Sequence, residues 1–198
     1  MYARHMVGLG SVLVAAAAVI RVDVGSNGAF TFTPDTIKAN VGDTLDFHFH
    51  PLNHSVVMGD FGNPCAPAKT GGFFSGFLPV SSGQATHSFQ VKVNSTDPVF
   101  FYCAQTILEH CRNGMAGVVN PSSSQTLGAY KNAAKSVGTA SHPASVFGGT
   151  LVSTPGPTSA SASPSPASTG GGAYAGDAAP AASGAVAALA LAVAAFLV

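Results

Sequence analysis

The sequence predicts an all-β domain, a Greek-key β-sandwich, followed by a disordered tail rich in serine, alanine, glycine and proline. Short segments rich in aromatic and β-branched residues recur between residues 22 and 120, and clusters of turn-forming residues separate them. No convincing amphipathic helix interrupts this series. Only 8% of the 198 residues are charged, against about 25% in ordinary globular proteins. Turns and linkers therefore account for much of the chain.

Each expected strand has its own pattern. Residues 44–49 and 87–93 alternate apolar and polar side chains, which is typical of strands with one buried face. Residues 30–32 are aromatic and β-branched, and residues 99–102 and 117–119 are short apolar runs typical of buried strands. Turn signals divide these segments at residues 25–28, 41–43, 81–83, 94–98 and 120–121.

Both ends of the chain look like processing signals. Residues 1–18 combine a weakly basic start, an apolar run and small residues, which indicates a secretory signal peptide. The alternative is that this run forms a first buried strand or helix. Residues 185–198 are apolar but shorter than the roughly 20 residues of a membrane helix. Because small residues precede them, we expect a GPI-attachment signal and a secreted, cell-surface protein held by a lipid anchor.

The composition changes once between these signals, near Pro121. Residues 19–121 form the expected folded domain, which is long enough for a single hydrophobic core. Residues 122–184 consist mainly of small and polar residues, which bury too little apolar surface to offset the entropy lost on ordering. We therefore expect a low-complexity stalk, with a segment typical of O-glycosylation at residues 153–169.

A cysteine, a histidine and a methionine lie in one loop between two expected strands, at Cys103, His110 and Met115. A fourth donor, His54, follows the strand expected at residues 44–49. Two imidazoles, a thiolate and a weak thioether are the ligands of a blue-copper electron-transfer site. The sequence therefore predicts one type 1 copper ion, bound by the two histidines and the cysteine, with the methionine as axial ligand.

The three cysteines agree with this prediction because their number is odd. In a secreted protein two of them are expected to pair, and the third needs another role. Binding copper gives Cys103 that role. The alternatives are a buried free thiol at Cys103, core packing for Met115 and an ordinary turn histidine at His54.

The residues around the expected ligands resemble known families. The copper loop looks like that of phytocyanins, and the whole set is similar to fungal cupredoxin-domain surface proteins called extracellular serine-rich proteins. The resemblance covers residues 22–121. It is carried by Val41-Gly42-Asp43, Asn53-His54-Ser55, Asn63-Pro64-Cys65, Ser75-Gly76-Phe77, Phe101-Tyr102-Cys103, His110-Cys111 and Gly114-Met115.

The resemblance implies a cupredoxin sandwich with His54, Cys103 and His110 as equatorial ligands and Met115 as axial ligand. It also implies a Cys65–Cys111 disulfide, which would tie the segment of the first ligand to the loop of the others. One departure is that the loop from Cys103 to His110 is two residues longer than in phytocyanins, near residues 107–109. This difference could loosen or expose the site.

Two further histidines, His48 and His50, are two residues apart and share one face of a strand. We interpret them as solvent-facing or edge histidines. The alternative is a second metal site, as in a small copper oxidase or a copper-storage protein.

The overall function that the sequence predicts is the binding of one copper ion, for electron transfer or for copper binding itself, without enzymatic activity. A zero net charge without basic runs argues against a nucleic-acid partner. We expect a monomer with an unidentified redox partner, and an N-glycan at Asn94. The alternative function is a non-redox wall or adhesion protein that has weakened or lost copper, with an aromatic surface formed by Phe61, Phe73, Phe74 and Phe77.

Overall fold

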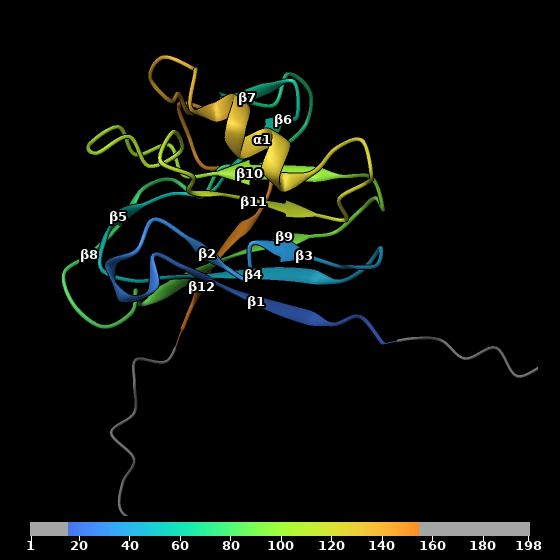
Figure 1. Cartoon of the computed structure of the whole chain (residues 1–198). Helices are drawn as coiled ribbons and strands as arrows, with labels where there is room; N and C mark the ends of the chain where they lie inside the picture. The colour runs from blue at the N-terminus through green and yellow to red at the C-terminus, as the bar shows by residue number, and fades with distance from the viewer. Residues whose placement is uncertain (1–15, 155–198) are drawn as a thin grey trace, which may run out of the picture. The chain divides into compact units, whose positions relative to one another are not determined.

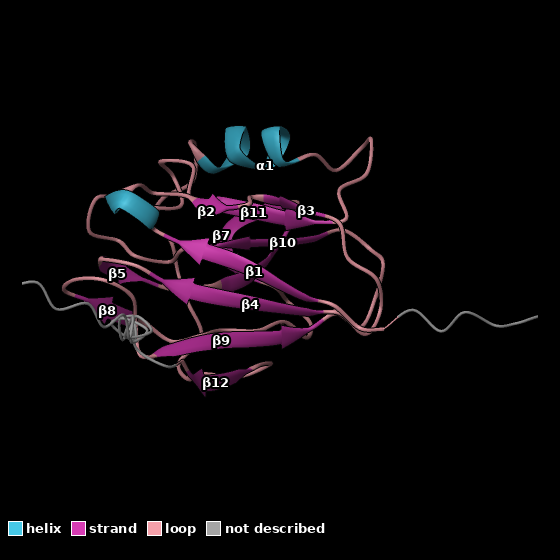
Figure 2. Ribbon diagram, turned by 90° about the horizontal axis from the view of Figure 1, so that it is seen from below, coloured by secondary structure: helices cyan, strands magenta, loops and turns pink. Residues whose placement is uncertain are grey.

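Two five-stranded sheets lie face to face, and a two-stranded sheet lies at one end (Figures 1 and 2). The computed structural model describes residues 16–154. The strands are β1 (Val19–Val24), β2 (Phe32–Thr33), β3 (Thr36–Ile37), β4 (Thr44–Phe49), β5 (Leu52–His54), β6 (Val57–Asp60), β7 (Asn63–Pro67), β8 (Leu78–Val80), β9 (His87–Lys92), β10 (Val99–Tyr102), β11 (Ala116–Val119) and β12 (Thr150–Ser153). The helices are the 3-10 turn η1 (Ser26–Gly28) and α1 (Leu127–Ala134).

The strand order is β12-β9-β4-β1-β2 in the first sheet and β3-β11-β10-β6-β7 in the second. Strands β5 and β8 form the small sheet. This architecture confirms the all-β sandwich that the sequence predicts. Two pairs, β1 with β4 and β3 with β11, are parallel, which the alternating pattern of single strands did not indicate.

An aromatic core fills the space between the two sheets. On β4, the side chains of Leu45, Phe47 and Phe49 are buried in this core, because alternate residues of a strand point to opposite faces. The ring of Phe47 meets that of Phe101 on the opposite sheet edge to face, with centroids 5.4 Å apart. Such contacts fix how the layers pack and hence where the loops at their ends lie.

Strand β10 is buried on both faces, which explains its continuous apolar sequence. Phe101 and Cys103 belong to the core between the sheets. Phe100 and Tyr102 belong to a second apolar cluster on the other face of the sheet. The second cluster also contains residues of α1, which lies on the outer side of this sheet in Figure 1.

The folded domain extends past the boundary expected at residue 121, so that expectation is wrong. The ring of Tyr130 on α1 stacks on Phe100 with centroids 4.9 Å apart, and β12 pairs with β9 at the edge of the first sheet. Residues 122–154 therefore belong to the domain and not to a stalk. The composition is that of a linker, but Thr126 caps α1 by accepting a hydrogen bond from the Ala129 N–H.

The ordered domain also begins slightly earlier than expected. The N–H of Ala18 donates to the Asp43 carboxylate at 2.8 Å, and its carbonyl accepts from the Thr44 N–H at 2.8 Å. The expected signal peptide at residues 1–18 otherwise lies outside the described residues, as do the rest of the expected stalk from residue 155 and the anchor signal at 185–198. Within the described part, no helix is long and apolar enough to span a membrane.

Candidate metal centre

The structure brings His54, Cys103 and His110 together at one end of the sandwich. His54 is the last residue of β5, Cys103 follows β10 directly, and His110 lies in the loop between β10 and β11. The Cys103 Sγ is 3.5 Å from Nδ1 of His110 and 3.9 Å from Nδ1 of His54. All three residues are buried, with exposed fractions of 0%, 0% and 2% in chain order. Metal ions are commonly held by His, Cys, Asp and Glu side chains. Among the described residues, His54, Cys103 and His110 form the group of such side chains whose ligand atoms lie close enough together to hold one.

The spacing of these donors fits a trigonal metal ion. Bonds of about 2.0 Å to nitrogen and about 2.3 Å to sulfur, at roughly 120° to one another, place each nitrogen about 3.7 Å from the sulfur. The two observed sulfur–nitrogen distances, 3.5 Å and 3.9 Å, lie on either side of this value. Two imidazoles and one thiolate are also the donor types that favour copper. The residues present therefore fit the copper site that the sequence predicts.

The loop from Cys103 to Met115 is held by its own backbone. The His110 N–H donates to the Gln105 carbonyl, the Met115 N–H donates to the His110 carbonyl, and the Cys103 N–H donates to the Met115 carbonyl. Through these bonds the backbone of Met115 connects the backbone of Cys103 with that of His110. Met115 is fully buried in the same core cluster as Cys103. Its role as an axial ligand remains a prediction.

The extra residues of this loop project outward. Ile107 and Leu108 are 73% and 67% exposed, and Leu108 and Glu109 have left-handed backbone angles of φ 61° and 47°. The lengthened segment thus bulges into solvent, while His110 beside it stays buried against the core. The longer loop does not expose the candidate ligands.

Ser55 supports the thiol of Cys103, a role that the sequence analysis did not assign. The Ser55 N–H donates to the Cys103 Sγ at 3.3 Å, and its hydroxyl oxygen accepts from the Ala104 N–H at 3.0 Å. Both bonds join the end of β5 to the start of the ligand loop. The sequence does contain one indication of this role: Ser55 directly follows the candidate ligand His54, and residues next to metal ligands commonly orient them.

The His54 ring is oriented by the backbone. Its Nε2 lies 3.2 Å from the carbonyl oxygen of Pro51. With Nε2–H as the donor, Nδ1 keeps its lone pair and faces the Cys103 sulfur. This is the tautomer that a metal ligand needs.

Burial keeps the three donors uncharged in the metal-free protein. It lowers the pKa of His54, and, together with the neighbouring His54 ring, it lowers the pKa of His110 to about 4. Burial also raises the pKa of the Cys103 thiol, against the opposing effect of hydrogen bonds from Gln105 and Ser55. Both imidazoles are therefore ready to donate at neutral pH, and metal binding would release the thiol proton.

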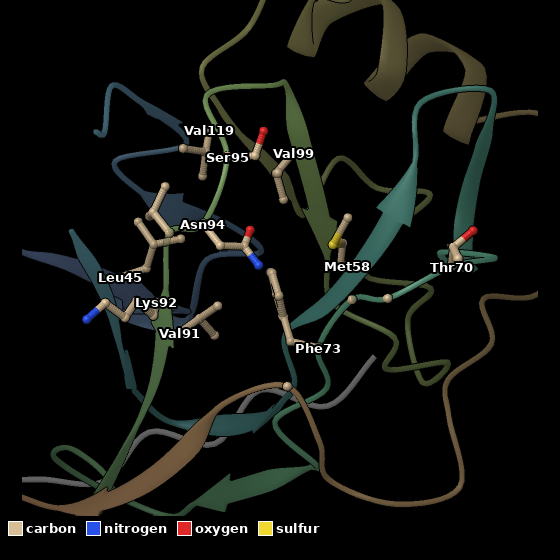
Figure 3. A pocket seen from close by; sticks show the side chains of 14 residues that line it. Leu45, Met58, Thr70, Phe73, Val91, Lys92, Asn94, Ser95, Val99 and Val119 are labelled. Atoms are coloured by element: carbon tan, nitrogen blue, oxygen red, sulfur yellow. The ribbon is translucent and has the colours of Figure 1, made fainter. Parts of the chain in front are cut away.

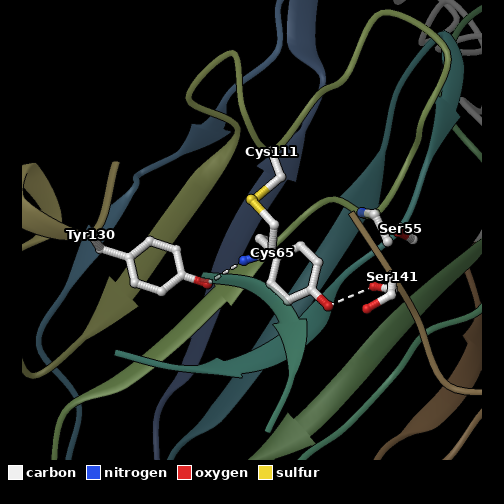
Figure 4. The surroundings of a disulfide bond; sticks show 7 residues. Ser55, Cys65, Cys111, Tyr130 and Ser141 are labelled. Atoms are coloured by element: carbon white, nitrogen blue, oxygen red, sulfur yellow. Dashed lines mark hydrogen bonds between the residues drawn. A yellow bond between two sulfur atoms is a disulfide. The ribbon is translucent and has the colours of Figure 1, made fainter. Parts of the chain in front are cut away.

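The predicted disulfide is present between Cys65 and Cys111, with Cα atoms 5.8 Å apart (Figure 4). It leaves Cys103 as the free cysteine. Because Cys111 follows His110 directly, the bond fixes one side of the ligand loop to β7. The Tyr130 hydroxyl accepts a hydrogen bond from the Cys65 N–H, so α1 supports the disulfide from behind.

His48 and His50 do not join the candidate metal centre. His48 Nε2 lies 2.8 Å from the Asp46 carboxylate, and His50 Nε2 lies 2.8 Å from the Asp23 carboxylate. The expectation of a solvent-facing or edge residue is wrong for His48, which is 8% exposed and lies on β4, the central strand of its sheet. Each ring is bound to a carboxylate.

The aromatic residues proposed for adhesion do not form an exposed surface. Phe73 and Phe74 are 4% and 3% exposed and belong to the two core clusters. Phe61 and Phe77 are partly buried against the second cluster. That version of the adhesion hypothesis is therefore wrong. Asn94, the expected glycan acceptor, is exposed, and its modification remains a prediction.

A cavity of about 250 Å³ lies between the sheets (Figure 3). Its apolar lining includes Leu45, Phe73, Val91 and Val119. None of the candidate metal ligands lines it. The candidate metal centre therefore lies outside this cavity.

Two proteins of the fungus Arthroderma benhamiae are similar to this chain. It is 38% identical over 138 residues to one named "Probable GPI-anchored cupredoxin-1", which covers 69% of this chain and 70% of that protein. It is 38% identical over 139 residues to an "Extracellular serine-rich protein", covering 70% of this chain but 53% of that protein. The chain thus matches about half the length of this second relative. No family model matches.

Solved structures with a detectable likeness have low scores. A mutant fern plastocyanin has a TM-score of 0.36 at 24% identity, and a purple cupredoxin from Nitrosopumilus maritimus has 0.37 at 15%. Each covers 50% of this chain and 96% of its own. Scores this low add no weight to the assignment, which rests on the sequence relatives. At the identity and coverage of the first relative, the chain belongs to the family of fungal GPI-anchored cupredoxins and extracellular serine-rich proteins.

Proposed function

We propose that this protein binds one type 1 copper ion and carries single electrons at the outer surface of the cell. The observation that supports this most directly is the buried trio of His54, Cys103 and His110, whose donor atoms lie within 4.8 Å of one another. The donor types and their spacing fit copper. The family assignment supports the same function.

The residues of the chain have distinct roles in this proposal. When bound, copper supplies a one-electron Cu(II)/Cu(I) couple. His54, Cys103 and His110 would hold it, with Met115 as a weaker fourth ligand. The Ser55 N–H stabilises negative charge on the thiolate by donating to it. The Pro51 carbonyl holds the His54 ring in one orientation, so that little has to rearrange when the charge of the site changes.

We propose a carrier and not an enzyme because the donors are enclosed by protein. An electron needs no open coordination position, whereas a substrate has to reach the metal. The three donor residues are at most 2% exposed. The cavity between the sheets does not extend to them.

We further propose that the protein is secreted and held at the cell surface by a GPI anchor. The expected signals at the two ends of the sequence support this. The names of the two relatives also support it, since one contains the words "Probable GPI-anchored" and the other the word "Extracellular". Phosphatidylinositol-specific phospholipase C should release the protein from intact cells. Retention on membranes after this treatment would contradict the anchor.

A copper titration of the purified protein tests the main proposal. We expect one copper ion per chain and an intense visible absorption from thiolate-to-copper charge transfer, with a matching Cu(II) EPR signal. Cys103→Ala should abolish the absorption. His48→Ala, which removes a histidine bound to Asp46, should leave it unchanged. A folded protein without this absorption at one equivalent of copper would refute the electron-transfer proposal.

A further inference from the structure

The loop between β1 and β2, residues 25–31, covers the candidate metal centre. Figure 2 shows its short helical turn, η1, at the same end of the sandwich as β5. The Gly25 N–H donates to the Thr31 carbonyl at 2.9 Å and closes the loop at its base. Gly25, Asn27 and Gly28 have left-handed φ angles of 78°, 57° and 70°. The loop is therefore a tight coil with a defined shape.

The first residue of this loop lies directly against one candidate ligand. A Cβ atom added to Gly25 would overlap the His54 ring, at 2.1 Å from Nε2. Neither this contact nor the left-handed backbone permits a side chain here. The backbone of the loop therefore covers the outer edge of His54.

The other end of the loop covers the second imidazole. The Phe30 ring stacks on His110 with centroids 3.9 Å apart and an angle of 26° between the planes. Phe30 is itself partly buried and packs against the core cluster that contains Cys103 and Met115. His110 has an exposed fraction of only 2% although its neighbours Ile107 and Leu108 are exposed. The phenyl ring is thus the outer wall of the site at His110.

We propose that Phe30 is the residue that closes the metal centre to external ligands and holds the plane of the His110 ring. This inference rests on the proposed function and specifies it. A closed centre passes electrons but excludes water, small anions such as azide, and chelators. The stacked arrangement of the two rings favours one orientation of the His110 ring. Phe30 acts through His110 and is a positioning residue.

The test compares Phe30→Ala with Phe61→Ala. Phe61 is also a partly buried phenylalanine, but it packs on Phe100, outside the metal centre. The first measurement uses metal-free protein and the rate at which a thiol reagent, 5,5′-dithiobis(2-nitrobenzoate), modifies Cys103. We expect at least a tenfold faster reaction in Phe30→Ala and the wild-type rate in Phe61→Ala. Equal rates in wild type and folded Phe30→Ala would overturn the proposal.

The second measurement uses copper-loaded protein and azide. We expect azide to change the visible and EPR spectra of Phe30→Ala at concentrations at least tenfold lower than for wild type or Phe61→Ala. If all three proteins respond to azide alike, closure by Phe30 is refuted. Should Phe30→Ala not fold, Phe30→Val, which also opens the wall but keeps an apolar side chain, has to give the same direction in both measurements.

The two measurements separate this inference from the proposed function. If thiol protection depends on Phe30 but no protein binds copper, closure stands and the copper proposal fails. If copper binds with its charge-transfer absorption but Phe30→Ala changes neither rate nor azide response, the copper proposal stands and closure fails. Nuclear magnetic resonance of the His110 ring protons adds a direct check of stacking, because loss of the phenyl ring current should shift them.

Discussion

The buried imidazoles of His54 and His110 occupy the protein core in their uncharged forms. Burial disfavours their protonation, and the Pro51 carbonyl fixes the His54 ring. The Nδ1 atoms of His54 and His110 therefore already lie 3.9 Å and 3.5 Å from the thiol sulfur before any metal arrives. A site preorganised in this way binds metal without first expelling protons from its histidines.

The low pKa of His110 predicts that the metal-free protein loses stability in mild acid. The pKa is about 4 in the folded protein, against an ordinary value of 6.5, so the unfolded chain binds more protons between these pH values. The contribution of uncharged His110 to the free energy of unfolding is therefore fully present above about pH 6.5, and it is lost as the pH falls towards 4. Urea unfolding of metal-free protein at pH 7 and pH 5 measures this.

The Asp43 carboxylate does not account for a change in this pH range. Hydrogen bonds from Asn40 and Ala18 lower the pKa of Asp43 below its ordinary value of 3.8, so this group titrates at more acidic pH. His110→Gln, which does not titrate, should reduce the dependence between pH 7 and pH 5, and the remainder comes from His54, whose pKa burial also lowers. A wild-type unfolding midpoint that is the same at both values would show that the imidazole is not held uncharged.

Removal of the Ser55 hydroxyl should destabilise the protein. In Ser55→Ala the buried Ala104 N–H loses its acceptor, and an unsatisfied buried donor costs about 1 to 3 kcal/mol. Urea unfolding at pH 7 measures the difference. The control is Ser122→Ala, which removes an exposed hydroxyl bonded to the Gln125 N–H and should cost about 0.5 kcal/mol or less. Equal effects of the two substitutions would contradict a supporting role for Ser55.

At the scale of elements, the disulfide links β7 to the ligand loop. Its cysteines are 46 residues apart in sequence, and closing a loop of this length stabilises the folded state by about 4 kcal/mol in the chain-entropy account. The double variant Cys65→Ala with Cys111→Ala should therefore lower the melting temperature by on the order of 10 °C. Because Cys111 adjoins His110, copper should also dissociate faster. Calorimetry and chelator competition measure the two effects, and an unchanged melting temperature would contradict the first.

Strands with a clear local pattern were predictable from the sequence, whereas strands defined by their neighbours were not. The alternation in β4 and β9 and the apolar run of β10 identify them directly. β7 contains Pro64 and Pro67, which argue against a strand, but it lies at the edge of its sheet, where proline is tolerated. β12 lies in a segment whose composition indicates a linker, and its pairing with β9 decides its structure.

The candidate ligands were predictable for the same reason. Cys103, His110 and Met115 are close in sequence, and their spacing is informative by itself. The contacts of Phe30 and Gly25 join segments that are distant in sequence. Residues 30–32 were expected to form a strand, but Phe30 lies in the loop before β2 and stacks on His110. Only the packing of the whole molecule places this ring.

At the scale of the whole molecule, residues 122–154 hold the two layers together. They run from α1 on the second sheet to β12 on the first (Figure 1). Between these elements, the Ser141 carbonyl accepts from the Tyr102 hydroxyl at 2.6 Å, and the Ser141 N–H donates to the Cys65 carbonyl at 3.0 Å. Tyr102 adjoins Cys103, so this segment supports the thiol ligand and the disulfide together.

This arrangement predicts that a chain ending at residue 121 will not form the metal centre, although it contains every candidate ligand. Truncation would expose Phe100 and Tyr102, which are at most 1% exposed, and remove Tyr130 from between them and solvent. Exposing a buried aromatic side chain costs about 1.5 to 3 kcal/mol, and the sum for this cluster is comparable to the 5 to 15 kcal/mol that stabilises a typical domain.

A chain ending at residue 154 is the matched control, because it keeps α1, β12 and the Ser141 contacts. We expect it to unfold cooperatively at the same urea concentration as the full-length protein and to bind one copper ion. The chain ending at residue 121 should show no cooperative transition and no charge-transfer absorption. If the shorter chain unfolds at the same urea concentration and binds copper, residues 122–154 are needed neither for the stability of the sandwich nor for the metal centre. Their contacts with Tyr102 and Cys65 would then contribute nothing to the site.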